Sequence, residues 1–184
     1  MCIRDRYKVK FLARDAETGR IGTYETPFTI PNLNKEEKRV AVSSVVLGSQ
    51  RVEMKEALYN AKDKEQAESV NPLVQGGLKL LPSVTRVFHR DRALYVYLQA
   101  YQQLAPAAQP LVAFVTFYRG QSKAFETPPM RVADALGNRL KTMPLKFEVP
   151  LSKLPEGAYK CQVTVLDPNA QKAAFWQAPI VIVP

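Results

Sequence analysis

The chain has 184 residues, of which 46% are hydrophobic and 23% charged, and its formal net charge is +9. This balance is typical of a globular protein and excludes collagen, coiled coils and wholesale disorder, while the length predicts one domain, or one with a fragment. No apolar run reaches the roughly 18 residues that a membrane-spanning helix needs.

The first six residues run directly into a strand-like segment that begins at Tyr7. They lack the pattern of a signal peptide, in which a basic segment is followed by an apolar stretch and a small-residue cleavage site. They resemble a translated adapter sequence, so we interpret residues 1–6 as a non-native scar; a genuine short N-terminus is the alternative. Without them Cys161 is the single thiol, and cysteine usage then indicates no redox compartment.

The segment 7–30 is echoed by residues 159–182 at a constant offset of 152, with no gap. Five positions are identical, and each copy has the pattern of a strand, a polar turn and a second strand. A chance match between two hairpins is the alternative, but the constant offset favours tandem domains. We therefore expect residues 7–33 to be the last hairpin of a truncated β-sandwich domain.

The next segment, residues 34–78, is predicted to hold a linker, a strand and a polar loop. Pro, Asn and charged residues cluster at 31–38, which is typical of a domain boundary. Residues 39–48 are rich in Val and predict a strand. Eight of the ten residues at 60–69 are polar or charged, which predicts a solvated loop.

Residues 79–184 predict a complete antiparallel β-sandwich. Short Val-, Tyr- and Phe-rich segments alternate there with turns that contain Gly, Pro and Asn. Such spacing is typical of an all-β sandwich or barrel. The predicted strands are 94–101, 111–118, 123–126, 145–149, 159–166 and 173–183.

A local motif made of Gly157, Tyr159 and Cys161 narrows the sandwich to the immunoglobulin-like type. In that type, a tyrosine two residues before a core position bonds back to the upstream backbone. Alternation places Tyr159 and Cys161 on one face of a strand, so we predict a structural role for all three residues. Cys161 is interpreted as a small buried hydrophobe rather than a catalytic or metal-binding thiol, and it has no cysteine partner for an inter-sheet disulfide.

Several sequence blocks resemble the C-terminal, β-rich region of von Willebrand factor A-related proteins of the acidobacterial type. The blocks are residues 26–31, 43–47, 82–88, 111–120 and 162–184. The resemblance implies an exported chain that is secreted or associated with the cell envelope. The Asp-x-Ser-x-Ser metal motif of the A domain is absent from this sequence, so metal-dependent adhesion is not implied.

The motifs of catalysis and of cofactor binding were sought and not found. His89 is the single histidine, and Asp91 is too near it in sequence to imply the partner that a general base needs. A zinc site needs about four clustered ligands, and the glycine-rich phosphate motifs do not occur. We therefore predict a non-enzyme with no cofactor and no metal.

One face of the strand at 94–101 carries Tyr95, Tyr97 and Tyr101. Such a row stacks on sugars in carbohydrate-binding sandwiches or, with basic residues, on single-stranded nucleic acid. Tyrosine is also a favoured strand residue that pairs across strands, and this structural interpretation is preferred. The basic residues are spread along the chain, which favours weak, salt-sensitive adhesion to anionic polymers over specific nucleic-acid binding.

Together these patterns predict a non-catalytic structural or protein-interaction β-sandwich module of a larger exported protein. The expected partners are neighbouring domains of the same full-length chain, other proteins, or anionic envelope polymers. The alternative is a carbohydrate-binding sandwich that uses Tyr95, Tyr97 and Tyr101. The expected location is extracellular, periplasmic or in the cell envelope, with no transmembrane segment.

Overall fold

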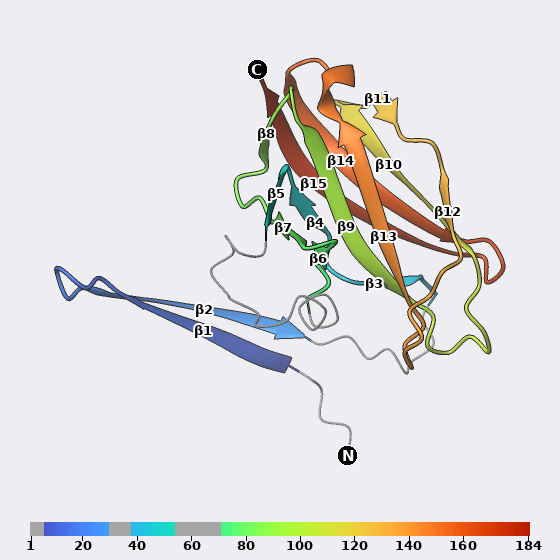
Figure 1. Cartoon of the computed structure of the whole chain (residues 1–184), viewed down its shortest axis with the longest axis horizontal. Helices are drawn as coiled ribbons and strands as arrows, with labels where there is room; N and C mark the ends of the chain where they lie inside the picture. Colours follow the sequence, from blue (N-terminus) through green and yellow to red (C-terminus); the bar gives the residue numbers. More distant parts are fainter. Residues whose placement is uncertain (1–5, 30–37, 54–70) are drawn as a thin grey trace. The chain divides into compact units, whose positions relative to one another are not determined.

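The computed structural model describes residues 6–29, 38–53 and 71–184, and its regular structure in these ranges is β-strand with one 3₁₀ turn. This confirms the predicted all-β class. The chain divides into two compact units, Met1–Lys35 and Glu36–Pro184. The elements are β1 (Arg6–Arg14), β2 (Ile21–Thr29), β3 (Ala41–Val42), β4 (Val46–Gly48), β5 (Gln50–Glu53), β6 (Val74–Gln75), β7 (Leu78–Leu81), β8 (Val87–His89), β9 (Ala93–Tyr101), β10 (Leu111–Arg119), β11 (Ser122–Glu126), β12 (Met130–Val132), β13 (Thr142–Pro150), η1 (Leu151–Lys153), β14 (Gly157–Asp167) and β15 (Lys172–Val183) (Figure 1).

The first unit is an antiparallel hairpin of β1 and β2. Aromatic rings of cross-strand neighbours lie against one another on one face. The distance between ring centroids is 5.5 Å for Tyr7 and Phe28 and 6.3 Å for Phe11 and Tyr24. These rings are exposed. A two-stranded hairpin has no second layer of its own, so its apolar residues form no core.

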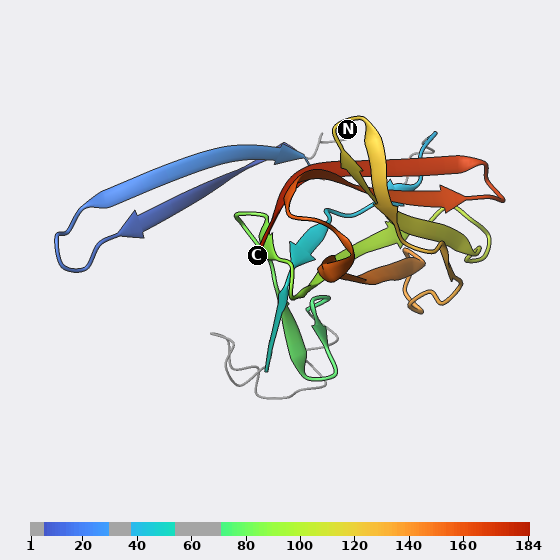
Figure 2. The ribbon, with the colours of Figure 1, turned by 90° about the horizontal axis from the view of Figure 1, so that it is seen from above.

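The second unit has two main sheets that face each other, as Figures 1 and 2 show. The larger sheet has the order β11-β10-β14-β15-β8, with β12 also paired to β10. The smaller has the order β13-β9-β3, with β4 also paired to β9. Every pair is antiparallel except β15 with β8, which is parallel. The arrangement is that of the predicted antiparallel β-sandwich.

Alternation along the strands produces one core between the two sheets. On β10, for example, Leu111, Ala113, Val115 and Phe117 are all fully buried, while the residues between them point to the opposite face. Burying each large apolar side chain contributes about 1.5–3 kcal/mol. The core also includes Leu94, Val96, Leu98, Ala100, Met143, Leu145, Phe147, Val149, Tyr159, Cys161, Val163, Val165, Ile180 and Ile182.

Two strands of the smaller sheet, β3 and β4, come from the segment at residues 39–48. In β3, Ala41 pairs with Tyr101, and in β4, Leu47 pairs with Val96. Leu47 is buried in the shared core. The sandwich therefore includes strands that precede residue 79, where we expected it to start, because they cover the edge of β9 that β13 leaves open. The predicted loop at 60–69 and residues 1–5 of the predicted scar lie outside the described residues.

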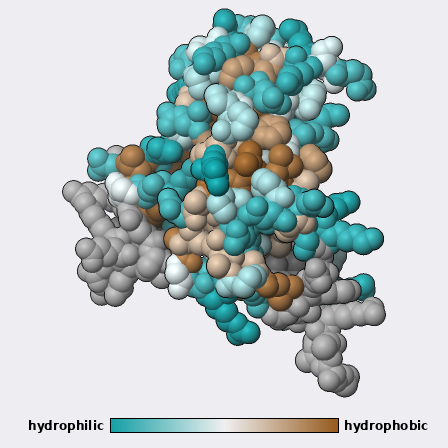
Figure 3. All heavy atoms as spheres, turned by 90° about the vertical axis from the view of Figure 1, so that its right-hand side faces the viewer, coloured by the Kyte–Doolittle hydropathy of each residue, from teal (hydrophilic) through white to brown (hydrophobic). Residues whose placement is uncertain are grey.

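A small antiparallel sheet of β5, β7 and β6 lies to one side of the sandwich (Figure 2). Its β5 follows β4 after one residue, so the two sheets are joined at a tight turn in the chain. The face drawn in Figure 3 carries hydrophobic side chains across its middle, with hydrophilic ones around them. Single exposed hydrophobics such as Leu104 and Leu136 are normal on protein surfaces and mark no site by themselves.

Candidate functional site

The three predicted tyrosines lie on the outer face of β9, turned away from the core. Tyr97 is only 9% exposed, and Tyr95 and Tyr101 are half-buried. Period-two alternation explains why they share a face, since Leu94, Val96 and the other intervening residues point inward. The predicted grouping of the tyrosines is thus present, but their rings are covered to different degrees.

Hydrogen bonds join this row through Gln99. The Gln99 Nε2 group donates to the Tyr97 hydroxyl at 2.9 Å, and the Tyr101 hydroxyl donates to Gln99 Oε1 at 3.1 Å. Burial raises the pKa of both Tyr97 and Tyr101, so these phenols stay protonated around neutral pH. Their hydroxyls are engaged in holding the strand face rather than directed at a ligand.

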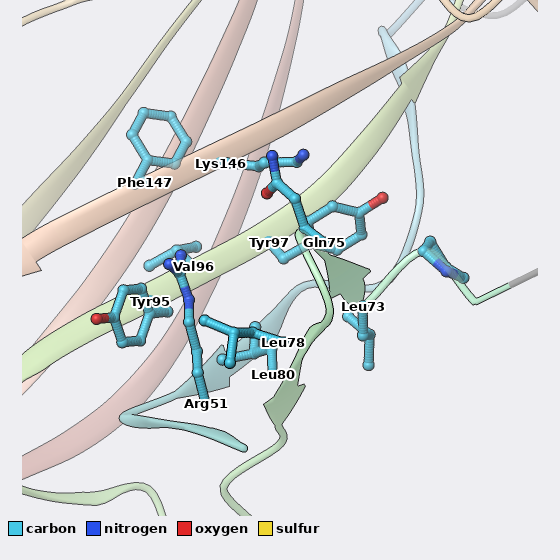
Figure 4. Close-up of a pocket in the computed structure, with 11 residues that line it drawn as sticks. Arg51, Leu73, Gln75, Leu78, Leu80, Tyr95, Val96, Tyr97, Lys146 and Phe147 are labelled. Atoms are coloured by element: carbon cyan, nitrogen blue, oxygen red, sulfur yellow. The ribbon is translucent and has the colours of Figure 1, made fainter. Parts of the chain in front are cut away.

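A hollow of about 80 Å³ separates the tyrosine face from the small sheet. Tyr95 and Tyr97 line it from β9, and Leu78 and Leu80 line it from β7. The Arg51 guanidinium carbon lies 3.9 Å from the centroid of the Tyr95 ring, and Figure 4 shows this side chain alongside the ring. The Arg51 cation therefore covers one face of the Tyr95 ring.

The corner before β14 has the hydrogen bond that its motif predicts. The Tyr159 hydroxyl donates to the Pro155 carbonyl at 2.7 Å. Gly157 has φ +138, a backbone conformation that favours glycine, and a side chain added there would meet the Arg119 guanidinium at 3.3 Å. Cys161 is fully buried beneath the corner, as alternation predicts, and burial raises its pKa to about 12.

His89 lies at the edge of the larger sheet, on β8. Its Nδ1 donates to the Pro184 carbonyl at 2.6 Å, and the side chain is exposed. Over residues 6–29, 38–53 and 71–184, no three His, Cys, Asp or Glu side chains gather in a way that could hold a metal ion. The geometry therefore gives His89 a role in fastening β8 to the end of β15.

The outer face of the larger sheet carries polar side-chain hydrogen bonds that the sequence did not predict. Gln177 donates to Gln162 at 2.6 Å, Gln162 donates to Thr164 at 3.1 Å, and on the neighbouring strands Thr116 donates to Glu126 at 2.9 Å. Alternation indicated that Gln162 and Thr164 share a face. Gln177, which bonds to Gln162, lies on β15, however, and cross-strand register is not visible in a single sequence.

Comparisons with protein-family models and with curated proteins find no match to this chain. In the described part of the chain, no helix is long and apolar enough to cross a membrane.

Proposed function

We propose that this chain is a non-catalytic structural or protein-interaction module of a larger exported protein of the von Willebrand factor A-related kind. Its sandwich would be immunoglobulin-like and would space or connect neighbouring domains. The observation that carries the proposal is the tyrosine corner, with Tyr159 bonded to Pro155 and Cys161 buried two residues later. Many cell-surface domains share this architecture, whereas the fold alone fixes no activity.

The strand order supports the immunoglobulin-like assignment. Strands β10, β14 and β15 are adjacent, as strands C, F and G are in that fold, and β9 pairs with β13, as B pairs with E. The corner tyrosine lies at the start of β14, which is the place that strand F gives it. The assignment thus rests on both the order of the strands and one specific hydrogen bond.

Several side chains that could take part in chemistry support a structural role, because they are engaged in holding the fold. Tyr97 and Tyr101 bond to Gln99, His89 bonds to the Pro184 carbonyl, and Cys161 is buried in the core. A general acid or base must be free to exchange its proton with a substrate within hydrogen-bond reach. The burial of Cys161 and the engaged hydroxyls of Tyr97 and Tyr101 therefore favour a scaffold over a catalyst.

Export is tested with an antibody raised against residues 36–184 and applied to intact and to lysed source cells. We expect labelling of intact cells and loss of that labelling after mild protease treatment of the cell surface. Labelling that requires lysis, with a cytoplasmic marker as control, would contradict the exported location. An immunoblot with the same antibody then gives the apparent mass of the mature protein and shows whether it is larger than this chain.

Carbohydrate binding is kept as the second candidate because Tyr95 and Tyr97 both line the hollow. A polysaccharide pull-down tests it with the full chain and two variants. Binding that is lost in Tyr95→Ala and retained in Tyr24→Ala, whose ring lies on the hairpin, would favour this candidate. If the polysaccharide binds the unaltered chain and both variants equally, Tyr95 is not part of a binding surface.

A further inference from the structure

We infer that the aromatic face of the β1–β2 hairpin is one half of a second sandwich core. Its occupant is a two-stranded, aliphatic-faced sheet equivalent to β9 and β13, supplied by the part of the same polypeptide that precedes β1. The inference rests on the proposed sandwich architecture and deepens it, because it names the partner of an otherwise uncovered surface.

The two hairpins have the same register when they are aligned at the offset of 152. In the first, Tyr7 pairs with Phe28 and Arg14 with Ile21. The positions 152 residues later are Tyr159 with Ile180 and Leu166 with Ala173, and these are also paired. If the pairing in one hairpin were shifted by one residue, its side chains would point to the opposite faces of the hairpin. Agreement of the register along both hairpins therefore places equivalent residues on equivalent faces.

The turns of the two hairpins agree as well. Asp15 Oδ1 accepts hydrogen bonds from the amides two and three residues later, at 2.9 and 3.4 Å. Asp167 Oδ1 does the same at 3.1 and 2.9 Å. Gly19 and Gln171, again 152 residues apart, both have positive φ, at 68° and 53°. The shared register and turn make the hairpins structural equivalents.

Their apolar faces differ in what covers them. Tyr159 and Val163 belong to the core that β9 and β13 help to build. Their counterparts Tyr7 and Phe11, together with Tyr24 and Phe28 on β2, are 44–64% exposed. A cluster of four exposed rings on one side of a hairpin is the kind of surface that marks an interface.

The opposite face of the hairpin is mostly charged, although Leu12 and Ile21 are exposed on it near the turn. Glu25 forms ion pairs there with Lys8 at 3.0 Å and with Lys10 at 3.2 Å. The aromatic face is therefore the one to be covered. In the second unit, β9 and β13 come before β14 in the chain, so the equivalent covering strands are expected before β1.

The test places a second copy of residues 36–158 directly before Tyr7 of the full chain, so that these residues precede Tyr7 as they precede Tyr159. Hydrogen exchange of peptides from β1 and β2 is followed by mass spectrometry in the fusion and in the original chain. We expect exchange in the fusion to slow about a hundredfold, because opening then requires disruption of a packed core. Unchanged exchange in a folded fusion would overturn the inference.

Two variants of adjacent residues provide matched controls. Phe11→Asp places a charge on the aromatic face and is expected to abolish the added protection, whereas Leu12→Asp places it on the opposite face and is expected to preserve it. Equal loss in both variants would overturn the inference. Protection of the original chain that increases with protein concentration would also overturn it, because a second copy would then be the occupant.

If the fusion does not fold, binding of a fluorescent apolar dye to the original chain provides a second measurement. Dye binding is expected to fall at least about threefold in Phe11→Asp and to persist in Leu12→Asp, since the exposed rings form the apolar surface. Dye binding that is unaffected by Phe11→Asp would count against a core-like face. These results are independent of the cell-surface labelling that tests the proposed function.

Discussion

At the scale of single residues, Tyr159 and Cys161 connect a local motif to the shared core. The Tyr159 ring is buried while its hydroxyl reaches the Pro155 carbonyl, so one side chain satisfies a backbone acceptor and packs the interior. This much was predictable from the sequence, because a corner is local in the chain. The stacking of Arg51 on Tyr95 was not, since Arg51 comes from β5, a strand that is distant in the chain.

Tyr159→Phe is expected to lower the free energy of unfolding by about 1–2 kcal/mol. The substitution removes the hydroxyl donor and leaves the Pro155 carbonyl without this hydrogen bond, while it retains the packed ring. Urea unfolding followed by Trp176 fluorescence measures the change. Tyr24→Phe, at an exposed hairpin position, is the control and should be near neutral; an equal effect of both would argue against a special corner.

The Cys161 thiol is expected to resist alkylation in the folded protein. Burial raises its pKa to about 12, so the reactive thiolate is scarce at pH 8, and reagents cannot reach the sulfur. In a Cys2→Ser background, where Cys161 is the single thiol, a thiol reagent should react at the rate of unfolding. Rapid, stoichiometric labelling without denaturant would show that the thiol is accessible.

Stability is expected to fall at alkaline pH, in part through the same thiol. A folded pKa of about 12 lies above the ordinary value of 9.0, so the neutral thiol is favoured by folding. This contribution is fully present below pH 9 and is lost as the pH rises from 9 towards 12. Urea midpoints across this range should decline less steeply for Cys161→Ala than for the unaltered chain; parallel declines would assign the effect to other groups, such as Tyr97 and Tyr101.

At the scale of elements, strands with strong alternation were predictable and short ones were not. The segment 94–101 corresponds to β9 (Ala93–Tyr101), and the segment 173–183 corresponds to β15 (Lys172–Val183). By contrast, β6 (Val74–Gln75) and β7 (Leu78–Leu81) are too short to show periodicity. They exist because β7 pairs with both β6 and β5, and the pairing with β5 is a tertiary contact.

The junction of β4 with the small sheet depends on Gly48. A Cβ added there would lie 2.3 Å from the Leu81 carbonyl oxygen and 2.9 Å from Leu80 Cδ1. Because the nearest atom belongs to the backbone, Gly48→Ala must displace β4 or β7, and we expect a loss of about 1–3 kcal/mol. Gly137→Ala, where an added Cβ meets nothing within 4 Å, is the control, and calorimetric melting of both variants measures the difference. Equal melting temperatures would contradict this close approach.

At the scale of the whole molecule, the sequence predicted two pleated layers but not all of their members. The layers follow from apolar alternation in long strands such as β10 and β14. The contributions of Val40 and Leu47 to the core come from a stretch that looked like a linker with one strand. Their membership depends on the free edge of β9, which becomes apparent only when the sheet is assembled.

The second unit is expected to keep its stability without the hairpin, because its core is built from residues 40–182. A chain that starts at residue 36 should unfold in urea within about 0.5 kcal/mol of the full chain, as expected for independent parts. The reporter is Trp176, the single tryptophan, which packs against this core.

A chain that starts at residue 49 loses β3 and β4, and with them Val40 and Leu47. It should be less stable by at least about 3 kcal/mol, because two core side chains are removed. Equal stability of the two truncated chains would place those strands outside the cooperative core, and a large loss on removing residues 1–35 alone would make the hairpin part of it.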